Sequence, residues 1–293
     1  MKPLAYYHVD VFSDKPLSGN GLIVFPEAAA LGTELMQRIT QEMRQFESIF
    51  LQDLSGSAVT ARVFTCEEEL DFAGHPVLGA AAILHDLYAK DKDVAHWNIK
   101  LNVKTVHVST QFKKGVYESW MNQGIPEFGV TLSAAETKEI MEVMNLSADD
   151  LYPGHLPVMV STGLPYLLLP LQHNAVNAKI KITDLEDRLR AFGAKFIGTL
   201  NIPDLSIRTW DNSGQVEDIA TGSLVGPCGA YLVKKGVKSA NEIIEFKQGY
   251  NLGRPSQLLV KALEKDGLIN DVYVGGDVCK IARGYLEANL TVD

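Results

Sequence analysis

Glu47 is the first of three ionisable side chains whose surroundings suit them to moving protons. It lies in the apolar run 46–51 (FESIFL), where strand alternation places it on one face with Ile49 and Leu51. Burial on that face would disfavour the charged carboxylate, raise its pKa and make it useful for proton transfer near neutral pH. The alternative is a glutamate at a strand end that reaches solvent.

His75 and Asp218 are the other two, and each lies beside a segment of small, apolar residues. His75 is in 74–84 (GHPVLGAAAIL), and Asp218 is in 217–223 (EDIATGS). The imidazole could exchange protons or bind a carboxylate, and the Asp218 carboxylate could act as a base. The alternatives are a capping or packing role for the histidine and helix capping for the aspartate.

Two buried helices are predicted at 74–84 and 222–232 (GSLVGPCGAYL), because both segments are apolar or small on nearly every side. Each begins at a glycine, Gly74 or Gly222. The unpaired N–H groups and the positive end of the dipole at a helix start favour an anion. Two hydroxyl side chains flank the second glycine: Thr221 and Ser223. The alternative is that these hydroxyls are ordinary helix-start groups.

The cysteines, histidines and glycines favour no other chemistry. Cys66, Cys228 and Cys279 are far apart and form no Cys-x-x-Cys, which argues against a disulfide framework or a thiolate zinc site and fits a reducing compartment. Cys228 lies within a predicted buried helix, where a core side chain is favoured over a nucleophile. No histidine pair has the spacing of a zinc site, and 19–21 (GNG) is no phosphate-binding loop. The sequence thus predicts no metal or nucleotide cofactor.

Composition and charge exclude several classes of partner. The 293 residues include 27 Lys and Arg against 36 Asp and Glu, a net charge of −9, which disfavours binding to nucleic acid. No run approaches the roughly 18 apolar residues of a membrane span. His8 and Asp10 interrupt the first apolar run, so no signal peptide is expected. We expect a soluble, cytoplasmic protein.

Short strands and a few helices must position these side chains. Turn residues separate the β-rich segments, which predicts an α+β fold with largely antiparallel sheets. The expected strands are 6–12, 22–25, 46–51, 61–65 and 101–109, and the other expected helices are 33–43, 133–144 and 183–192. Thr33 is predicted to be the N-cap of its helix.

A weak internal duplication divides the chain in two. Three segment pairs recur in one order at offsets of 144, 146 and 148 residues (163 − 19, 208 − 62 and 222 − 74), close to half the chain length. The pairs are 19–25 with 163–169, 62–65 with 208–211, and 72–80 with 219–226. They predict two similar halves, the alternative being chance likeness between apolar strand–turn units.

Together these segments resemble the PhzF family of isomerases, named for phenazine biosynthesis. The motifs run in order through nearly the whole chain: 10–12 (DVF), 19–20 (GN), 46–48 (FES), 71–76 (DFAGHP), 161–165 (STGLP), 217–223 (EDIATGS), 248–249 (QG), 253–256 (GRPS) and 275–276 (GG). The resemblance implies a diaminopimelate-epimerase-like fold of two pseudo-symmetric α+β halves. Each half is a curled, mostly antiparallel sheet around a central helix, with the active site in the cleft between them. We expect halves at 1–116, with a returning strand at 278–293, and at 117–277.

The resemblance also implies proton transfer on a small carboxylate-bearing substrate, without metal, pyridoxal phosphate or nucleotide. Glu47 would remove a proton from carbon and return it elsewhere, while His75 and Asp218 handle or orient a polar group. The residues expected to bind substrate are Asn20, Ser48, Asp71, Gly74, Thr221, Gly222 and Ser223. In this family a proline usually follows the aspartate. Ile219 stands there instead, so we expect a less rigid loop. A homodimer is implied as well.

Two other functions stay open. One is an amino-acid epimerase or racemase on the same scaffold, which the lack of paired thiols disfavours. The other is a protein that binds metabolites or protein partners without turnover, which the complete set of Glu47, His75 and Asp218 disfavours.

Overall fold

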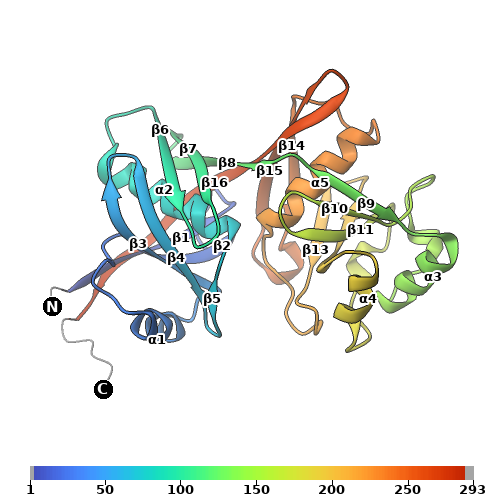
Figure 1. The fold of residues 1–293 in the computed structure, drawn as a ribbon, viewed down its shortest axis with the longest axis horizontal. Coiled ribbons are helices and arrows are strands. Elements are labelled where there is room, and N and C mark those ends of the chain that lie inside the picture. The colour runs from blue at the N-terminus through green and yellow to red at the C-terminus, as the bar shows by residue number, and fades with distance from the viewer. Residues whose placement is uncertain (1–2, 288–293) are drawn as a thin grey trace. The chain divides into compact units, whose positions relative to one another are not determined.

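The computed structural model describes residues 3–287 and divides into two compact units (Figure 1). Unit 1 runs to Asn122 and resumes at Gly275, and unit 2 is Gln123–Val274. The long strand β16 (Leu268–Leu286) pairs antiparallel with β1 of unit 1. Residues 288–293 of the predicted returning strand lie outside the described residues.

Unit 1 is a sheet with two helices, α1 (Thr33–Met43) and α2 (Gly74–Tyr88). The strands follow the order β1-β2-β3-β4-β6-β7-β8, with β5 paired to β4. They are β1 (Leu4–Val11), β2 (Asn20–Phe25), β3 (Glu47–Ser55), β4 (Ala58–Thr65), β5 (Glu69–Leu70), β6 (Val94–Lys100), β7 (Thr105–Lys113) and β8 (Val116–Gly124).

Unit 2 has the strand order β15-β14-β13-β12-β11-β10-β9. The strands are β9 (Glu127–Thr131), β10 (Val158–Ser161), β11 (Pro165–Leu171), β12 (Phe196–Asn201), β13 (Ser206–Thr209), β14 (Ile243–Gln248) and β15 (Ser256–Lys265). The helices are α3 (Ala134–Val143), α4 (Leu185–Ala191) and α5 (Gly222–Lys234), with short 3₁₀ turns η1 (Ala148–Asp150), η2 (Ala175–Asn177) and η3 (Tyr250–Leu252).

The two units repeat one strand pattern. In unit 1 the pairs β1–β2, β2–β3, β3–β4 and β4–β6 are antiparallel, parallel, antiparallel and parallel. In unit 2 the pairs β10–β11, β11–β12, β12–β13 and β13–β14 alternate in the same way. The first parallel pair is joined through α1 or α4, and the second through α2 or α5. The predicted α+β fold of two similar halves is thus confirmed.

Each unit packs its sheet against one buried helix, as predicted. Every residue from His75 to His85 of α2 is buried, and the helix packs against β1, β2, β3, β6 and β7. A Cβ at Gly79 would lie 2.5 Å from Leu22 Cδ2, so glycine permits this close approach. In α5, a Cβ at Gly229 would lie 2.3 Å from Val260 Cγ1 of β15.

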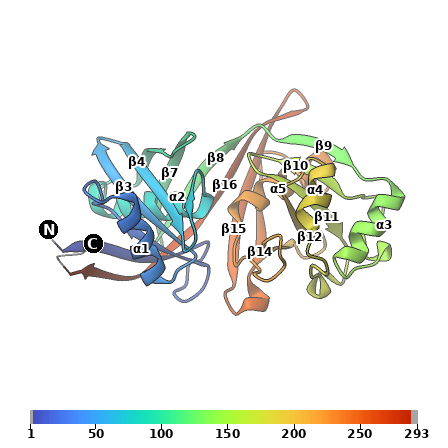
Figure 2. The same ribbon diagram turned by 60° about the horizontal axis from the view of Figure 1, so that its bottom comes forward.

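A second apolar layer in unit 1 lies between the sheet and α1, which rests against β3 and β4 (Figure 2). Phe25 stacks on Phe50 at 4.6 Å between ring centroids, and Phe64 meets Phe50 edge-on at 5.6 Å. The predicted cap of α1 was wrong. Gly32 is the N-cap, and Thr33 is the first helical residue, whose hydroxyl accepts a hydrogen bond from Arg62 Nη2 at 2.9 Å.

The predicted strand 101–109 was also too long at its start. Strand β6 ends at Lys100, and Leu101 N–H donates to the Lys104 carbonyl across a tight turn at 2.9 Å before β7 begins at Thr105. Within residues 3–287, no helix has both the length and the apolar character needed to cross a membrane.

Candidate active site

Glu47 and His75 meet in unit 1, at the starts of β3 and α2. Glu47 pairs with Leu22 of β2 on one side and with Thr65 of β4 on the other. Glu47 Oε2 lies 3.3 Å from His75 Nδ1, and the two side chains are only 16% and 9% exposed. The structure therefore places a carboxyl group and an imidazole within reach of one proton, away from bulk water.

His75 is a neutral imidazole in this setting. Burial lowers its pKa from 6.5 to about 3, because desolvation outweighs a hydrogen bond with the backbone of Gly21 that acts in the opposite direction. The close contact with Glu47 is therefore not an ion pair at neutral pH. A neutral ring holds one N–H donor and one acceptor nitrogen, so it can either orient the carboxyl group or relay its proton.

Sheet alternation separates Ser48 from this pair. Its strand partners Ile23 and Phe64 belong to the apolar cluster under α1, on the face of the sheet opposite Glu47. The Ser48 side chain is fully buried there. Asn20 is also buried, at the start of β2, and Asp71 is exposed in the bend before α2.

The two predicted glycines each begin their helix. Gly74 is the first residue of α2, and Gly222 is the first residue of α5. A Cβ on Gly74 would lie 3.1 Å from the Met121 side chain. The Gly222 carbonyl accepts a hydrogen bond from Gln123 Nε2 at 2.9 Å. Both helices therefore start where the sequence predicted, with their positive ends at the proposed binding residues.

Asp218 of unit 2 is held by the end of β13 and by Thr221, and the segment 218–221 forms the turn that leads into α5. The Asp218 N–H donates to the Thr209 carbonyl at 3.0 Å. The Thr221 hydroxyl donates to Asp218 Oδ2 at 2.6 Å, and Thr221 is itself the N-cap of α5. The carboxylate predicted from the motif is thus oriented by the residue that starts the buried helix.

Gln248, the last residue of β14, completes this cluster. Its Nε2 donates to the Asp218 carbonyl and to Thr221 Oγ1, both at 2.9 Å, and its Oε1 accepts from Thr221 N–H at 2.8 Å. No role was predicted for Gln248 from the sequence, although it lies in one of the family motifs.

Tyr166 is a second residue that the sequence analysis missed, and it lies beside Ser223. The two hydroxyl oxygens are 2.8 Å apart, and Tyr166 is only 3% exposed. Burial raises the phenol pKa, the hydrogen bond with Ser223 acts against that rise, and the negative charge of Asp218 adds to it. The phenol therefore stays protonated and can fix the orientation of the Ser223 hydroxyl.

The strand registers show that the repeat does not extend to the glutamate. Leu22 pairs with Glu47 in unit 1, and Tyr166 pairs with Phe196 at the equivalent place in unit 2. Phe196 thus takes the position of Glu47, and its ring lies 5.5 Å from that of Tyr166. At this position only unit 1 carries a carboxyl group.

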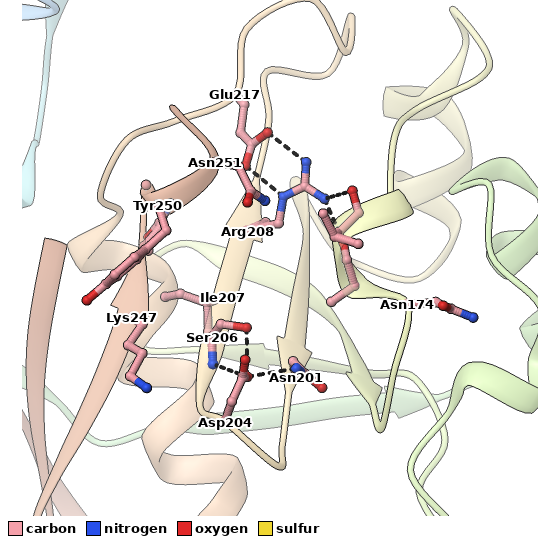
Figure 3. Close-up of a pocket in the computed structure, with 14 residues that line it drawn as sticks. Asn174, Asn201, Asp204, Ser206, Ile207, Arg208, Glu217, Lys247, Tyr250 and Asn251 are labelled. Atoms are coloured by element: carbon pink, nitrogen blue, oxygen red, sulfur yellow. Dashed lines mark hydrogen bonds and ion pairs between the residues drawn. The ribbon is translucent and has the colours of Figure 1, made fainter. Parts of the chain in front are cut away.

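An open pocket of about 430 Å³ lies next to the Asp218 turn, within unit 2 (Figure 3). Its wall includes Arg208 and Glu217, which form a two-bond ion pair with both N–O distances at 2.7 Å (Figure 3). Arg208 Nη1 also donates to carbonyl groups at 175, 176 and 178. Because Glu217 directly precedes Asp218, this pair anchors the chain that leads into the turn.

Neither thiols nor metal ligands gather in the described part of the chain. Cys228 is fully buried, and burial raises its thiol pKa, which confirms the predicted core role. Across residues 3–287, no three His, Cys, Asp or Glu side chains are grouped so as to hold a metal ion.

Comparison with known proteins places the chain in a family. A model described as phenazine biosynthesis-like protein, PhzC-PhzF, matches residues 9–284. The chain is 29% identical over 304 residues to trans-2,3-dihydro-3-hydroxyanthranilate isomerase of Pseudomonas fluorescens, covering 95% of this chain and 98% of that protein.

Solved structures agree. A structure described as a predicted epimerase from Pseudomonas aeruginosa is 45% identical, with a TM-score of 0.89 over 99% of this chain and 100% of that one. A probable proline racemase from Agrobacterium radiobacter, only 10% identical, shares the fold, with a TM-score of 0.62 over 98% of this chain and 93% of that one. The chain therefore belongs to the phenazine biosynthesis-like family and is an isomerase, as its motifs predicted.

Proposed function

We propose that this isomerase moves a proton between two positions of a small, carboxylate-bearing substrate, without a cofactor. The observation that carries the proposal is the Glu47–His75 contact at 3.3 Å, with both side chains largely removed from water. A carboxyl group can remove a proton from carbon and return it at another carbon, so the reaction needs no other reactant.

In this proposal Glu47 is the base and then the acid, and His75 supports it. Glu47 takes a proton from an acidified C–H bond of the substrate, and the electron pair shifts along the conjugated system. The neutral imidazole at Nδ1 holds the carboxyl group in position between the two transfers. The proton then goes back to a different carbon, and the double bond has moved.

The residues of α5 and its turn would bind the polar groups of the substrate. The N–H groups of Gly222 and Ser223 lie at the positive end of α5, where they favour a carboxylate and the negative charge that develops as the proton leaves. The Ser223 hydroxyl, held by Tyr166, adds a donor or acceptor. Asp218 would bind or protonate a polar substituent.

The relative from Pseudomonas fluorescens suggests the first substrate to test, trans-2,3-dihydro-3-hydroxyanthranilate, which bears a carboxylate. Incubation in D₂O followed by NMR should show the compound converted to an isomer with up to one deuterium at the newly protonated carbon. A panel of other unsaturated carboxylates extends the search if this compound is inert. Failure of every member to exchange hydrogen with solvent would contradict the proposal.

Epimerisation is the second candidate, because the 45% identical relative is described as a predicted epimerase. Its first step is the same proton removal, but the proton returns to the same carbon from the opposite side. The NMR experiment in D₂O separates the two reactions: isomerisation places hydrogen or deuterium at a new carbon and moves the double bond, whereas epimerisation replaces hydrogen by deuterium at the same carbon and leaves the double bonds in place.

A further inference from the structure

We infer that Gln248 is a positioning residue that holds Asp218 as an oriented carboxylate by acting through Thr221. This inference rests on the proposed role of Asp218 in the reaction. Gln248 is only 2% exposed, and the groups that it bonds lie 27 to 30 residues earlier in the chain.

The hydrogen bonds run in one direction, from Gln248 through Thr221 to Asp218. The Gln248 Nε2–H group donates to Thr221 Oγ1. The Thr221 hydroxyl in turn donates its own hydrogen to Asp218 Oδ2, at 2.6 Å. Each bond in such a chain polarises the next and strengthens it. A donor aimed at a carboxylate stabilises the charged form and lowers its pKa. The amide therefore acts on the Asp218 side chain without touching it.

Gln248 also fixes the backbone of the turn. It bonds the Asp218 carbonyl and the Thr221 N–H, so both ends of the turn are tied to the end of β14. Gly249, which follows, has φ of 76°, and a Cβ there would lie 2.6 Å from the Ile219 carbonyl oxygen. The end of β14 is thus packed closely against the turn, which restrains a segment that lacks a proline at Ile219.

The experiment compares Gln248→Ala with the unmodified chain by two readouts. The first is the ¹³C titration of the Asp218 carboxyl, whose signal is the one missing in Asp218→Asn. We expect the Asp218 pKa to rise, but by less than in Thr221→Val, because the Thr221 hydroxyl remains and is only no longer oriented by Gln248 Nε2. This readout needs no substrate, so it still decides the role of Gln248 if the proposed reaction proves wrong.

The second readout is kinetic and uses the substrate that the D₂O experiment identifies. We expect kcat to fall about tenfold or more, with KM changed less than about threefold, because Gln248 would act on orientation rather than binding. The limb of the pH–rate profile that reports Asp218 should move to higher pH. In Gln248→Glu, a protonated carboxyl can replace one N–H donor, so activity should recover partly as the pH falls.

Two further variants guard against a purely structural effect. Gln172→Ala removes a half-buried glutamine that donates to the Asp149 carbonyl, and it should leave both readouts unchanged. Thr221→Val retains Gln248 but removes the hydroxyl that donates to Asp218, so it should also raise the Asp218 pKa. This variant keeps the inference testable if Gln248→Ala does not fold. An unchanged Asp218 titration in folded Gln248→Ala or Thr221→Val overturns the inference.

Discussion

His75 illustrates how burial changes the chemistry of a single residue. Histidine is the side chain that ordinarily titrates near neutral pH, yet here its pKa falls to about 3 because α2 and the sheet remove it from water. Its part beside Glu47 is therefore that of a neutral donor and acceptor. The hydrogen bond with the backbone of Gly21 is too weak to offset the free energy lost when a charged imidazolium is removed from water.

The depressed pKa predicts a pH-dependent stability. The unfolded chain takes up a proton on His75 below about pH 6.5, and the folded chain does so only near pH 3, so stability is lost as the pH falls between these values. Between pH 6 and 4, the free energy of unfolding should fall by about 1.4 kcal/mol per pH unit more in the unmodified chain than in His75→Gln. Urea unfolding at a series of pH values measures this difference, and equal slopes would contradict it.

Residue types and spacing predicted Glu47, His75 and Asp218 as candidates, and the structure places the first two 3.3 Å apart. The parts played by Gln248 and Tyr166 could not be predicted, because both depend on contacts across 27 to 57 residues of sequence. Nothing in a local pattern shows which distant hydroxyl or amide a buried side chain will meet. Ser48 lies beside Glu47 in the sequence, but the strand turns it to the other face.

At the scale of the element, α2 and α5 position the candidate residues because each is narrow enough to lie against its sheet. Their small residues let the helix axis approach the strands, and each helix begins beside the candidate residues of its own unit. Composition alone predicted both helices. Helix capping was harder to predict. In α1 the N-cap is Gly32 and not Thr33, because the Thr33 hydroxyl accepts a hydrogen bond from Arg62 instead.

Gly229 tests this packing. A Cβ there would lie 3.0 Å from Val260 Cβ, an atom that cannot move without its backbone. Gly229→Val should therefore lower the free energy of unfolding by roughly 1–3 kcal/mol through overpacking. Gly32→Ala is the control, because a Cβ there meets no atom within 4 Å. We expect it to lower the free energy of unfolding by less than about 1 kcal/mol. Thermal or urea unfolding of the three proteins decides, and a Gly229 variant as stable as the control would refute the packing argument.

At the scale of the whole molecule, the two units share a strand pattern, and each has an arginine–glutamate ion pair at an equivalent place. Arg62 binds Glu69 in unit 1, and Arg208 binds Glu217 in unit 2. Each guanidinium also lies over an aromatic ring two residues further on, 5.2 Å from Phe64 and 4.7 Å from Trp210. The sequence repeat predicted this equivalence of Arg62 and Arg208, because both begin the second pair of repeated segments.

The two units share one strand pattern, but they differ at positions of the candidate site residues. Phe196 occupies the place of Glu47, and Ser223 is the second residue of α5 where His75 is the second residue of α2. The two units therefore carry different groups at equivalent positions, and the proposal assigns removal of the proton from carbon to Glu47 alone. This assignment is the central claim, and it predicts that one substitution in unit 1 stops the reaction.

Solvent-deuterium incorporation by Glu47→Gln tests that claim most directly. The substitution keeps the shape of the side chain but removes its ability to take a proton, so turnover and deuterium incorporation should fall by about 10²- to 10⁴-fold. Glu67→Gln, at an exposed glutamate of the same unit, is the matched control and should retain full activity. If folded Glu47→Gln still incorporates deuterium at the rate of the unmodified chain, Glu47 is not the base and the account is wrong.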